Sequence, residues 1–374
     1  METIKPQVTH GIVWRQQDRT NFKYNGWPSV TKDEHGVLYA AASSMRMSHV
    51  DPSGKDCMFI SKNEGETWTR PIVVEDSYFD DRDAGITYLG DGKLLLTWFT
   101  LAYDDDCAGI QDYDWFPPRD KAMSLGFTKC WGMIQGEERT RATGAFVKLS
   151  EDYGVTWSDP IKVPLTAPHG ASVCSDGRLV YMGKEMNPEY LAPNPIVVYT
   201  SFDNGRTWEH TGTVSPGADI TNENMHEPHV VELPNGRLLG AIRVHGRSEK
   251  PESSVYVTYS DDKGKTWSTP VGIGVDGLPP HLLVHSSGAV ICSYGCRNPD
   301  APDGRSERAA VSYDGGETWT EDYMLDDRIR GQHDMGYPAS VELSDGSILT
   351  VYYQCLPGEW WTSVLYTKWR LNEK

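Results

Sequence analysis

Six stretches of the chain alternate apolar and polar residues on both sides of a turn glycine. They read SVTKDEHGVLYAAA, ITYLGDGKLLLTWF, SVCSDGRLVYMG, VVELPNGRLLGAI, LLVHSSGAVICSY and SVELSDGSILTVYY, with the glycine at positions 36, 92, 177, 236, 288 and 346. Alternation with a period of two is the periodicity of a β-strand, and a DG, NG or SG pair between two such strands is typical of a hairpin turn. The pattern therefore predicts six β-hairpins.

A second repeat follows each of the first five hairpins. The sequence S-x-[DN]-x-G-x-T-W occurs at 61–68, 150–157, 201–208, 260–267 and 312–319, and it accounts for five of the 13 tryptophans. Asp or Asn can bind nearby backbone, Gly allows a positive φ, and Trp can fill an apolar gap in a neighbouring element. The box predicts a tight turn with a structural role, and we assign no chemistry to it.

The spacing of the two repeats indicates one repeating unit of four strands. From each hairpin glycine to the next box glycine the distances are 29, 62, 28, 28 and 28 residues. The second distance exceeds the common value by 62 − 28 = 34 residues. We interpret residues 102–143 as an insertion within the second unit, and the whole chain, 1–374, as a single domain.

The two ends of the chain complete the last unit. After the sixth hairpin glycine 374 − 346 = 28 residues remain, which is room for one more strand, at 361–371, and no box. The segment Val8–Arg15 is available as the missing fourth strand. This arithmetic predicts an all-β fold, a six-bladed β-propeller of four-stranded antiparallel blades whose last blade is closed by the N-terminal strand.

Composition restricts the partners. The chain has 35 Lys and Arg against 53 Asp and Glu, so the net charge is −18, which argues against nucleic acid and anionic membranes as partners. It leaves open an anionic small ligand, which responds to its local pocket. No secretory signal and no apolar run of membrane-spanning length is present. Seven scattered cysteines without a CxxC pair fit reduced thiols, and we expect a cytoplasmic protein.

The strand directions also predict where a site lies. In a four-stranded meander both turns lie at one end of the blade, so the starts of the first strands and the ends of the second strands meet at the other end. Chemically active residues of several blades share these two positions, and we expect them to converge on one funnel, the mouth. Nine residues before the hairpin glycines stand Trp27, Asp83, Pro168, Glu227, Pro279 and Tyr337. Near the second strand ends stand Arg46, Lys184, Arg243 and Arg297.

Five histidines are also expected near the mouth. They have no spacing typical of a metal site, so we interpret them as hydrogen-bonding pocket residues. They are His49, His169, His226, His229 and His333.

The box resembles the Asp box of sialidases, and the chain resembles that superfamily over essentially its whole length. Three finer matches support the resemblance. Arg46 is followed five residues later by Asp51, as the family's arginine is followed by its general acid. Glu227 opens E-x-x-V-V-E-L-x-x-G with Arg243 sixteen residues on, and Tyr337 begins the last blade eight residues before a turn Asp-Gly.

The resemblance implies a mechanism. Tyr337 would attack the sugar, Glu227 would take its proton, and Asp51 would protonate the leaving oxygen. Arg46, Arg243 and a third arginine would bind an acidic sugar; Arg308 is our candidate for the third, with Arg305 and Arg297 as rivals. The neutral tyrosine suits a sialoside because a carboxylate nucleophile would repel the sugar's own carboxylate.

One feature of the family is missing. Sialidases open the first blade with Arg-Ile-Pro, and that arginine completes a three-arginine clamp on the carboxylate. This chain has Gly26 at that place, in Tyr24-Asn-Gly-Trp-Pro28. Arg82, in Asp81-Arg-Asp83, is a candidate substitute from the second blade. The leading hypothesis is a sialidase-like exo-glycosidase that acts with retention on a terminal, acidic sugar and needs no metal or organic cofactor.

Two alternatives stay open. The first is a propeller hydrolase or polysaccharide lyase for another glycan, such as a uronic acid or rhamnose-containing chain, with His226, His229 or His333 as acid or base. The second is a non-catalytic glycan-binding propeller. Lys184, Asp83, His169 and His226 are expected to contact the glycan in each case. The 102–143 insertion, rich in Asp and aromatic residues, is a candidate substrate contact or a contact between copies in a homo-oligomer.

Overall fold

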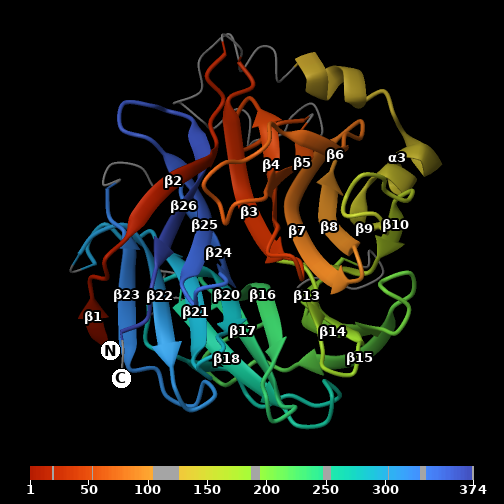
Figure 1. The fold of residues 1–374 in the computed structure, drawn as a ribbon. Coiled ribbons are helices and arrows are strands. Elements are labelled where there is room, and N and C mark those ends of the chain that lie inside the picture. The colour runs from red at the N-terminus through yellow and green to blue at the C-terminus, as the bar shows by residue number, and fades with distance from the viewer. Residues whose placement is uncertain are drawn as a thin grey trace.

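Six sheets are arranged like blades around a common centre (Figure 1). The structure is a computed structural model, and it describes residues 1–18, 21–52, 54–103, 126–186, 194–246, 254–301, 303–328 and 334–372. The prediction of a six-bladed β-propeller with four-stranded antiparallel blades is confirmed. Among the described helices, none has the length and hydropathy needed to cross a bilayer.

The first three blades follow the chain in order, each from the centre outward. Blade 1 contains β3 (Tyr24–Lys32), β4 (Leu38–Arg46), β5 (Lys55–Ser61) and β6 (Ile72–Glu75). Blade 2 contains β7 (Asp80–Gly90), β8 (Lys93–Leu101), β9 (Gly144–Ser150) and β10 (Ile161–Val163). Blade 3 contains the short β11 (Leu165–Thr166) and β12 (Ser172–Val173), then β13 (Leu179–Glu185), β14 (Ile196–Ser201) and β15 (Glu209–Val214).

The remaining three blades complete the ring. Blade 4 contains β16 (Met225–Glu232), β17 (Leu238–Val244), β18 (Ser254–Ser260) and β19 (Val271–Gly272). Blade 5 contains β20 (Leu278–Val284), β21 (Val290–Cys296), β22 (Ser306–Ser312) and β23 (Glu321–Asp326). Blade 6 contains β24 (Gly336–Glu342), β25 (Ile348–Cys355), β26 (Thr362–Trp369) and β2 (Thr9–Trp14).

The N-terminal strand closes the ring as the residue count predicts. β2, which lies near the N-terminus, pairs antiparallel with β26, the last strand along the chain. β2 is thereby the outermost strand of blade 6. A shorter strand, β1 (Glu2–Ile4), pairs parallel with β23 on the outside of blade 5, and no sequence pattern indicated it. The two termini consequently lie near each other at the edge of the propeller (Figure 1).

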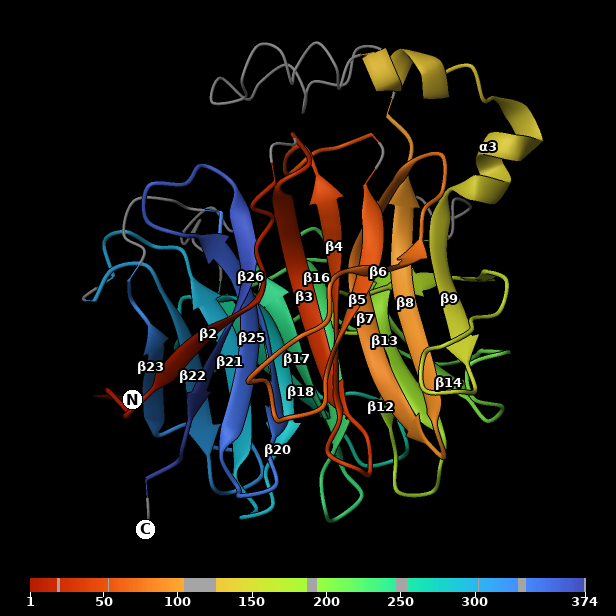
Figure 2. The same cartoon turned by 45° about the horizontal axis from the view of Figure 1, so that its top comes forward.

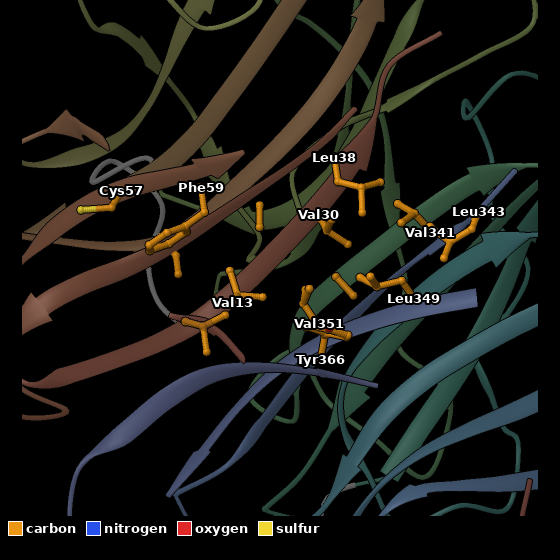
Figure 3. Close-up of a cluster of buried hydrophobic side chains, with 14 residues drawn as sticks. Val13, Val30, Leu38, Cys57, Phe59, Val341, Leu343, Leu349, Val351 and Tyr366 are labelled. Carbon is orange, nitrogen blue, oxygen red and sulfur yellow. The ribbon is translucent and has the colours of Figure 1, made fainter. Parts of the chain in front are cut away.

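Apolar cores between adjacent blades hold the ring together. One core joins blades 1 and 6, where Val30 and Phe59 meet Val341, Leu349 and the side chains around them (Figure 3). Burying aliphatic and aromatic side chains in this way is the main stabilising contribution to such a fold. Each box tryptophan packs against one of five such cores: Trp68, Trp157, Trp208, Trp267 and Trp319. The sixth core contains Trp369 of β26, which takes the place of the missing box.

A β-bulge interrupts the innermost strand of five blades. The pairing register shifts between residues 26 and 29, 82 and 85, 226 and 229, 278 and 281, and 336 and 339. A bulge leaves a residue unpaired and turns its side chain in a new direction. In four blades that residue has a positive φ although it is not glycine: Trp27 (52°), Asp83 (59°), Glu227 (41°) and Tyr337 (52°).

The sequence explains why these bulges form where they do. Pro28, Pro228 and Pro338 directly follow three of the four residues. Proline has no N–H to give to a neighbouring strand, so it is tolerated where the ladder is already broken. Non-glycine residues in the left-handed region are uncommon and persist only where the surrounding structure holds them, often at functional sites.

The link between β8 and β9 contains the insertion. Residues 104–125 lie outside the described residues, and the rest of the link includes α3 (Gly136–Ala142). The arrows of β4 and β8 point to the end of the propeller at which α3 lies (Figure 2). That end is the predicted mouth, so α3 lies at the same end of the propeller as the bulges.

Candidate functional site

Tyr337 and Glu227 meet at the mouth although 110 residues separate them. The Tyr337 hydroxyl donates a hydrogen bond to Glu227 Oε1, and Arg243 Nη1 lies 2.5 Å from Glu227 Oε2. Glu227 and Arg243 come from neighbouring strands of blade 4, whereas Tyr337 comes from blade 6. The glutamate is therefore bound by a neutral hydroxyl on one oxygen and by a guanidinium on the other.

The surroundings of this pair favour a charged Glu227 and a neutral Tyr337. Burial works against an ionised Glu227, but Arg243 and the Tyr337 hydroxyl outweigh it, and the pKa of Glu227 is lowered. Burial and the nearby carboxylates of Glu227 and Asp83 raise the pKa of Tyr337 well above its usual value. At neutral pH the pair thus consists of a neutral phenol that donates to an ionised carboxylate.

Arg297 and an aromatic cluster lie beside Tyr337. The Arg297 guanidinium lies 5.9 Å from the centre of the Tyr337 ring and donates to the Tyr353 hydroxyl at 3.0 Å. Tyr24 and Trp27 complete the cluster, in which all four aromatic side chains are buried. Cation–π contact and hydrogen bonding both favour this position for the guanidinium.

Two further arginines flank Trp27. The guanidinium carbons of Arg46 and Arg82 lie 4.9 and 4.3 Å from the Trp27 ring centre. Asp80 holds both: its carboxylate lies 2.6 Å from Arg46 and 3.5 Å from Arg82. Arg82 also donates to the Tyr103 hydroxyl at 3.2 Å. Arg46 is completely buried, whereas Arg82 keeps part of its side chain exposed.

Asp83 occupies the bulge position of blade 2 and is buried. Its backbone N–H donates to Ser43 Oγ at 2.9 Å, while its Oδ1 is buried without a hydrogen-bond partner among the described residues. Burial raises the pKa of Asp83 to about 7; Arg82 opposes this shift and Glu227 adds to it. Asp83 is thus close enough to the Tyr337–Glu227 pair to interact with it electrostatically.

Two residues expected by resemblance do not join this group. Asp51 is completely buried, and its Oδ2 accepts the Met47 N–H at 2.6 Å, which closes the turn after β4. Arg308 lies in β22, where it binds Asp322 at 2.6 Å and Asp303 at 3.2 Å. This geometry corrects the expectation for the third arginine: Arg297 is the one that approaches Tyr337, because it follows the inner strand β21.

Lys184 and His226 lie together beside Glu227. Lys184 Nζ donates to the carbonyl oxygens of Asn222 and Met225, and burial lowers its pKa to about 8. The His226 ring lies 4.4 Å from the His245 ring, centre to centre. Burial, His245 and Lys184 lower the pKa of His226 to about 4, so its ring is neutral.

Three histidines lie deeper along the axis. His169, His229 and His281 line a cavity of about 290 Å³, with ring centres 4.4 to 5.9 Å apart. Burial lowers the pKa of each ring. His169 thus shares this cavity with His229 and His281, and His333 lies outside the described residues. Within the described ranges no three His, Cys, Asp or Glu side chains are grouped so that they could hold a metal ion.

Sequence reasoning missed several residues of the mouth. Tyr353 stands seven residues after its hairpin glycine, as Arg243 and Lys184 do, so the register alone could have found it. Tyr24 begins β3 and Asp334 lies two residues before β24, and each stands twelve residues before its hairpin glycine, so the register could have found them as well. Asp80, the carboxylate that binds Arg46 and Arg82, directly precedes the motif already noted at 81–83.

Comparison with known proteins agrees with this architecture. Residues 124–352 match the model of the BNR repeat-like domain. A curated relative, a sialidase of Bacteroides fragilis, is 23% identical over an alignment of 294 positions, which covers 71% of this chain and 48% of that protein. The chain thus spans about half the length of that relative.

Solved structures resemble the fold along nearly the whole chain. A Dyadobacter fermentans protein of unknown function superimposes with a TM-score of 0.75 at 21% identity, covering 98% of this chain and 99% of that one. The NanB sialidase of Streptococcus pneumoniae superimposes with a TM-score of 0.65 at 15% identity, covering 96% of this chain and 70% of that one. At such identities the likeness concerns the fold.

The fold and the match define the class of protein. The chain is a sialidase-type six-bladed β-propeller. It belongs to the BNR repeat-like family, within the sialidase superfamily.

Proposed function

We propose that the protein is a retaining exo-glycosidase that releases a terminal acidic sugar through a tyrosine nucleophile. The observation that carries the proposal is the contact of Tyr337 with Glu227, on whose other oxygen Arg243 lies. Two bulges with positive φ in different blades bring these residues together, a strained conformation that is common at functional sites.

The charges suit the first step. A sugar with a carboxylate on its anomeric carbon repels a carboxylate nucleophile, whereas neutral Tyr337 does not. As the phenol oxygen attacks, its proton can pass along the existing hydrogen bond to Glu227. Arg243 remains beside the glutamate, and Arg297 beside the tyrosine ring limits the build-up of negative charge.

Recognition of the acid group rests on fewer arginines than in the sialidase pattern. Arg243 and Arg297 approach the reacting pair, while Gly26 stands where the first arginine of the family stands. An added Cβ at Gly26 would lie 3.2 Å from the Tyr24 ring, so that ring would have to move slightly to admit a side chain there. Arg82 stacks on Trp27 and is the remaining candidate for a third contact.

The test is turnover of fluorogenic α-sialoside, β-glucuronide and neutral glycosides by the wild type and by Tyr337→Phe. We expect hydrolysis of an acidic glycoside, with a loss of kcat/KM of at least about 10³-fold in the variant. Tyr294→Phe is the matched control, because Tyr294 is also buried and its hydroxyl donates to Asp322 at 2.8 Å in blade 5. A fluorinated sugar that slows the second step should add its mass to the wild type and not to Tyr337→Phe.

The alternatives give different results in the same assays. Formation of an unsaturated uronic acid in place of a hydrolysed sugar would indicate a lyase, for which the neutral His226 ring beside Glu227 could act as the base. Glycan binding without any turnover would indicate a binding module. Hydrolysis that survives Tyr337→Phe would overturn the proposed mechanism.

A further inference from the structure

A histidine–aspartate pair lies at the mouth, with its imidazole against the Trp27 ring. His49 Nδ1 lies 3.2 Å from Asp334 Oδ1. The His49 ring meets Trp27 edge-on, 4.9 Å between centres, and Tyr337 meets Trp27 edge-on as well, at 6.4 Å. The imidazole and the Tyr337 ring thus both lie against the same indole ring.

The aspartate of this pair is firmly held. The hydroxyls of Tyr24 and Tyr353 each donate to its carboxylate at 2.8 Å. Burial works against ionisation, but His49, Arg297 and the Tyr24 hydroxyl hold the pKa of Asp334 well below its usual value. His49 Nδ1 lies 3.0 Å from the Tyr24 hydroxyl oxygen and 3.2 Å from the ionised Asp334, and both can accept its proton. Nε2 is then the nitrogen of His49 that exchanges protons.

The same turn contains Asp51, the acid implied by the family pattern. Its carboxylate is completely buried and binds the backbone N–H of Met47. Ser48 Oγ donates to the Val50 carbonyl oxygen at 2.6 Å and braces the turn further. Within this braced turn His49 keeps 28% of its side-chain surface exposed. The turn thus presents the imidazole and buries the carboxylate.

We propose that His49, oriented by Asp334, is the proton-transfer residue of this site in place of Asp51. The inference rests on the proposed glycosidase function. In the first step the Tyr337 oxygen bonds to the anomeric carbon and its proton moves to Glu227. The bond to the leaving oxygen breaks, and the imidazolium form of His49 gives its Nε2 proton to that oxygen, which leaves as an alcohol. Burial lowers the pKa of His49, and Asp334 opposes this shift and favours the imidazolium.

The second step restores every group. Neutral His49 Nε2 takes a proton from water, and the water oxygen bonds to the anomeric carbon as its bond to Tyr337 breaks. The phenolate then regains its proton from Glu227. The sum is one glycoside and one water converted to one free sugar and one alcohol. Asp334 does not touch the sugar and acts as a positioning residue.

Leaving-group dependence separates this role from a structural one. A general acid matters for a poor leaving group, such as the sugar of a natural disaccharide, and little for a nitrophenolate. We expect His49→Gln to lose about 10²–10⁴-fold in kcat/KM on the disaccharide and less than about 10-fold on the nitrophenyl glycoside. Asp334→Asn should shift the same ratio in the same direction, by a smaller factor.

The matched control is Asp51→Asn, which keeps an oxygen to accept the Met47 N–H. Its ratio between the two substrates should stay at the wild-type value. The ratio within one preparation does not depend on the folded fraction, so partial misfolding leaves the test intact. A leaving-group effect in Asp51→Asn and none in His49→Gln would overturn the inference while the glycosidase function stands. No hydrolysis of either substrate by the wild type would instead contradict the proposed function.

Discussion

The two ends of the propeller both contain residues with positive φ, but they use that conformation differently. At the turn end each box glycine has a positive φ, for example Gly205 at 91°, and the polar groups bind one another within eight residues. Asp203 accepts the N–H and hydroxyl of Thr207, and Trp208 Nε1 donates to the Gly205 carbonyl. At the mouth the same region of φ is occupied by Trp27, Asp83, Glu227 and Tyr337, and the Tyr337 hydroxyl binds Glu227 of another blade.

The difference distinguishes architecture from chemistry. A strained residue satisfied by its own neighbours forms a stable turn, and its sequence can repeat in five blades. A strained residue satisfied only across the ring, as Tyr337 is by Glu227, requires the whole fold to hold it. We therefore expect changes at the turn end to reduce stability, and changes at the mouth to reduce activity with less effect on stability.

The largest effect should follow from Glu227→Gln. The amide cannot take the Tyr337 proton, so kcat should fall about 10²–10⁴-fold. The shape of the side chain is kept, and thermal unfolding should change little. Steady-state kinetics and a melting curve on the same preparation check both parts. A large fall in melting temperature together with normal kcat would break the distinction between the two ends.

A change at the turn end should give the reverse pattern. Trp208 packs against the core between blades 2 and 3 and lies 5.6 Å from the Tyr181 ring. Trp208→Ala should lower the free energy of unfolding by about 3 kcal/mol, the lower end of the range for buried aromatics, because Trp208 is only partly buried. Urea unfolding measures this, and kcat/KM per folded molecule should remain that of the wild type.

Sequence alone predicted the fold because the repeats are local and their spacing is regular. The hairpin glycines and boxes counted six blades, and β2 and β26 formed where the residue count left room for them. The spacing from the hairpin glycines also predicted that Glu227, Arg243 and Tyr337 lie at the same end of the propeller. It could do so because position along a strand fixes position along the axis.

The rest of the site depends on side-chain contacts that the position of a residue along its strand does not predict. Arg297 and Arg308 are eleven residues apart in the sequence. Arg297 directly follows β21, whereas Arg308 lies in β22, one strand further from the centre, and the two side chains therefore have different surroundings. Asp51 matches a family spacing, yet its carboxylate turns inward to bind Met47. Asp334 reaches His49 across 285 residues from outside any strand, a pairing that only the closed ring creates.

The smallest predicted effect is on the pH dependence of stability. It differs between Asp83 at the mouth and Asp203 at the turn end. Burial raises the pKa of Asp83 to about 7 in the folded protein, whereas in the unfolded chain the group ionises near pH 3.9. Between these values the unfolded state has released the proton that the folded state retains, so stability falls as pH rises through this window. Asp83→Asn removes that loss. Its melting temperature relative to wild type should rise from pH 5 to pH 8, by the equivalent of about 1–2 kcal/mol.

Asp203 at the turn end should respond with the opposite sign. Burial is the largest single influence and opposes its ionisation, but hydrogen bonds from Thr207 and Ser201 together outweigh it and lower its pKa. Its ionised form therefore stabilises the fold at every pH above the unfolded value. Asp203→Asn should therefore lower the melting temperature by the same amount at pH 5 and at pH 8. If both variants instead lost stability equally and independently of pH, Asp83 would be an ordinary ionised carboxylate. The mouth would then store no electrostatic strain that the turn end lacks.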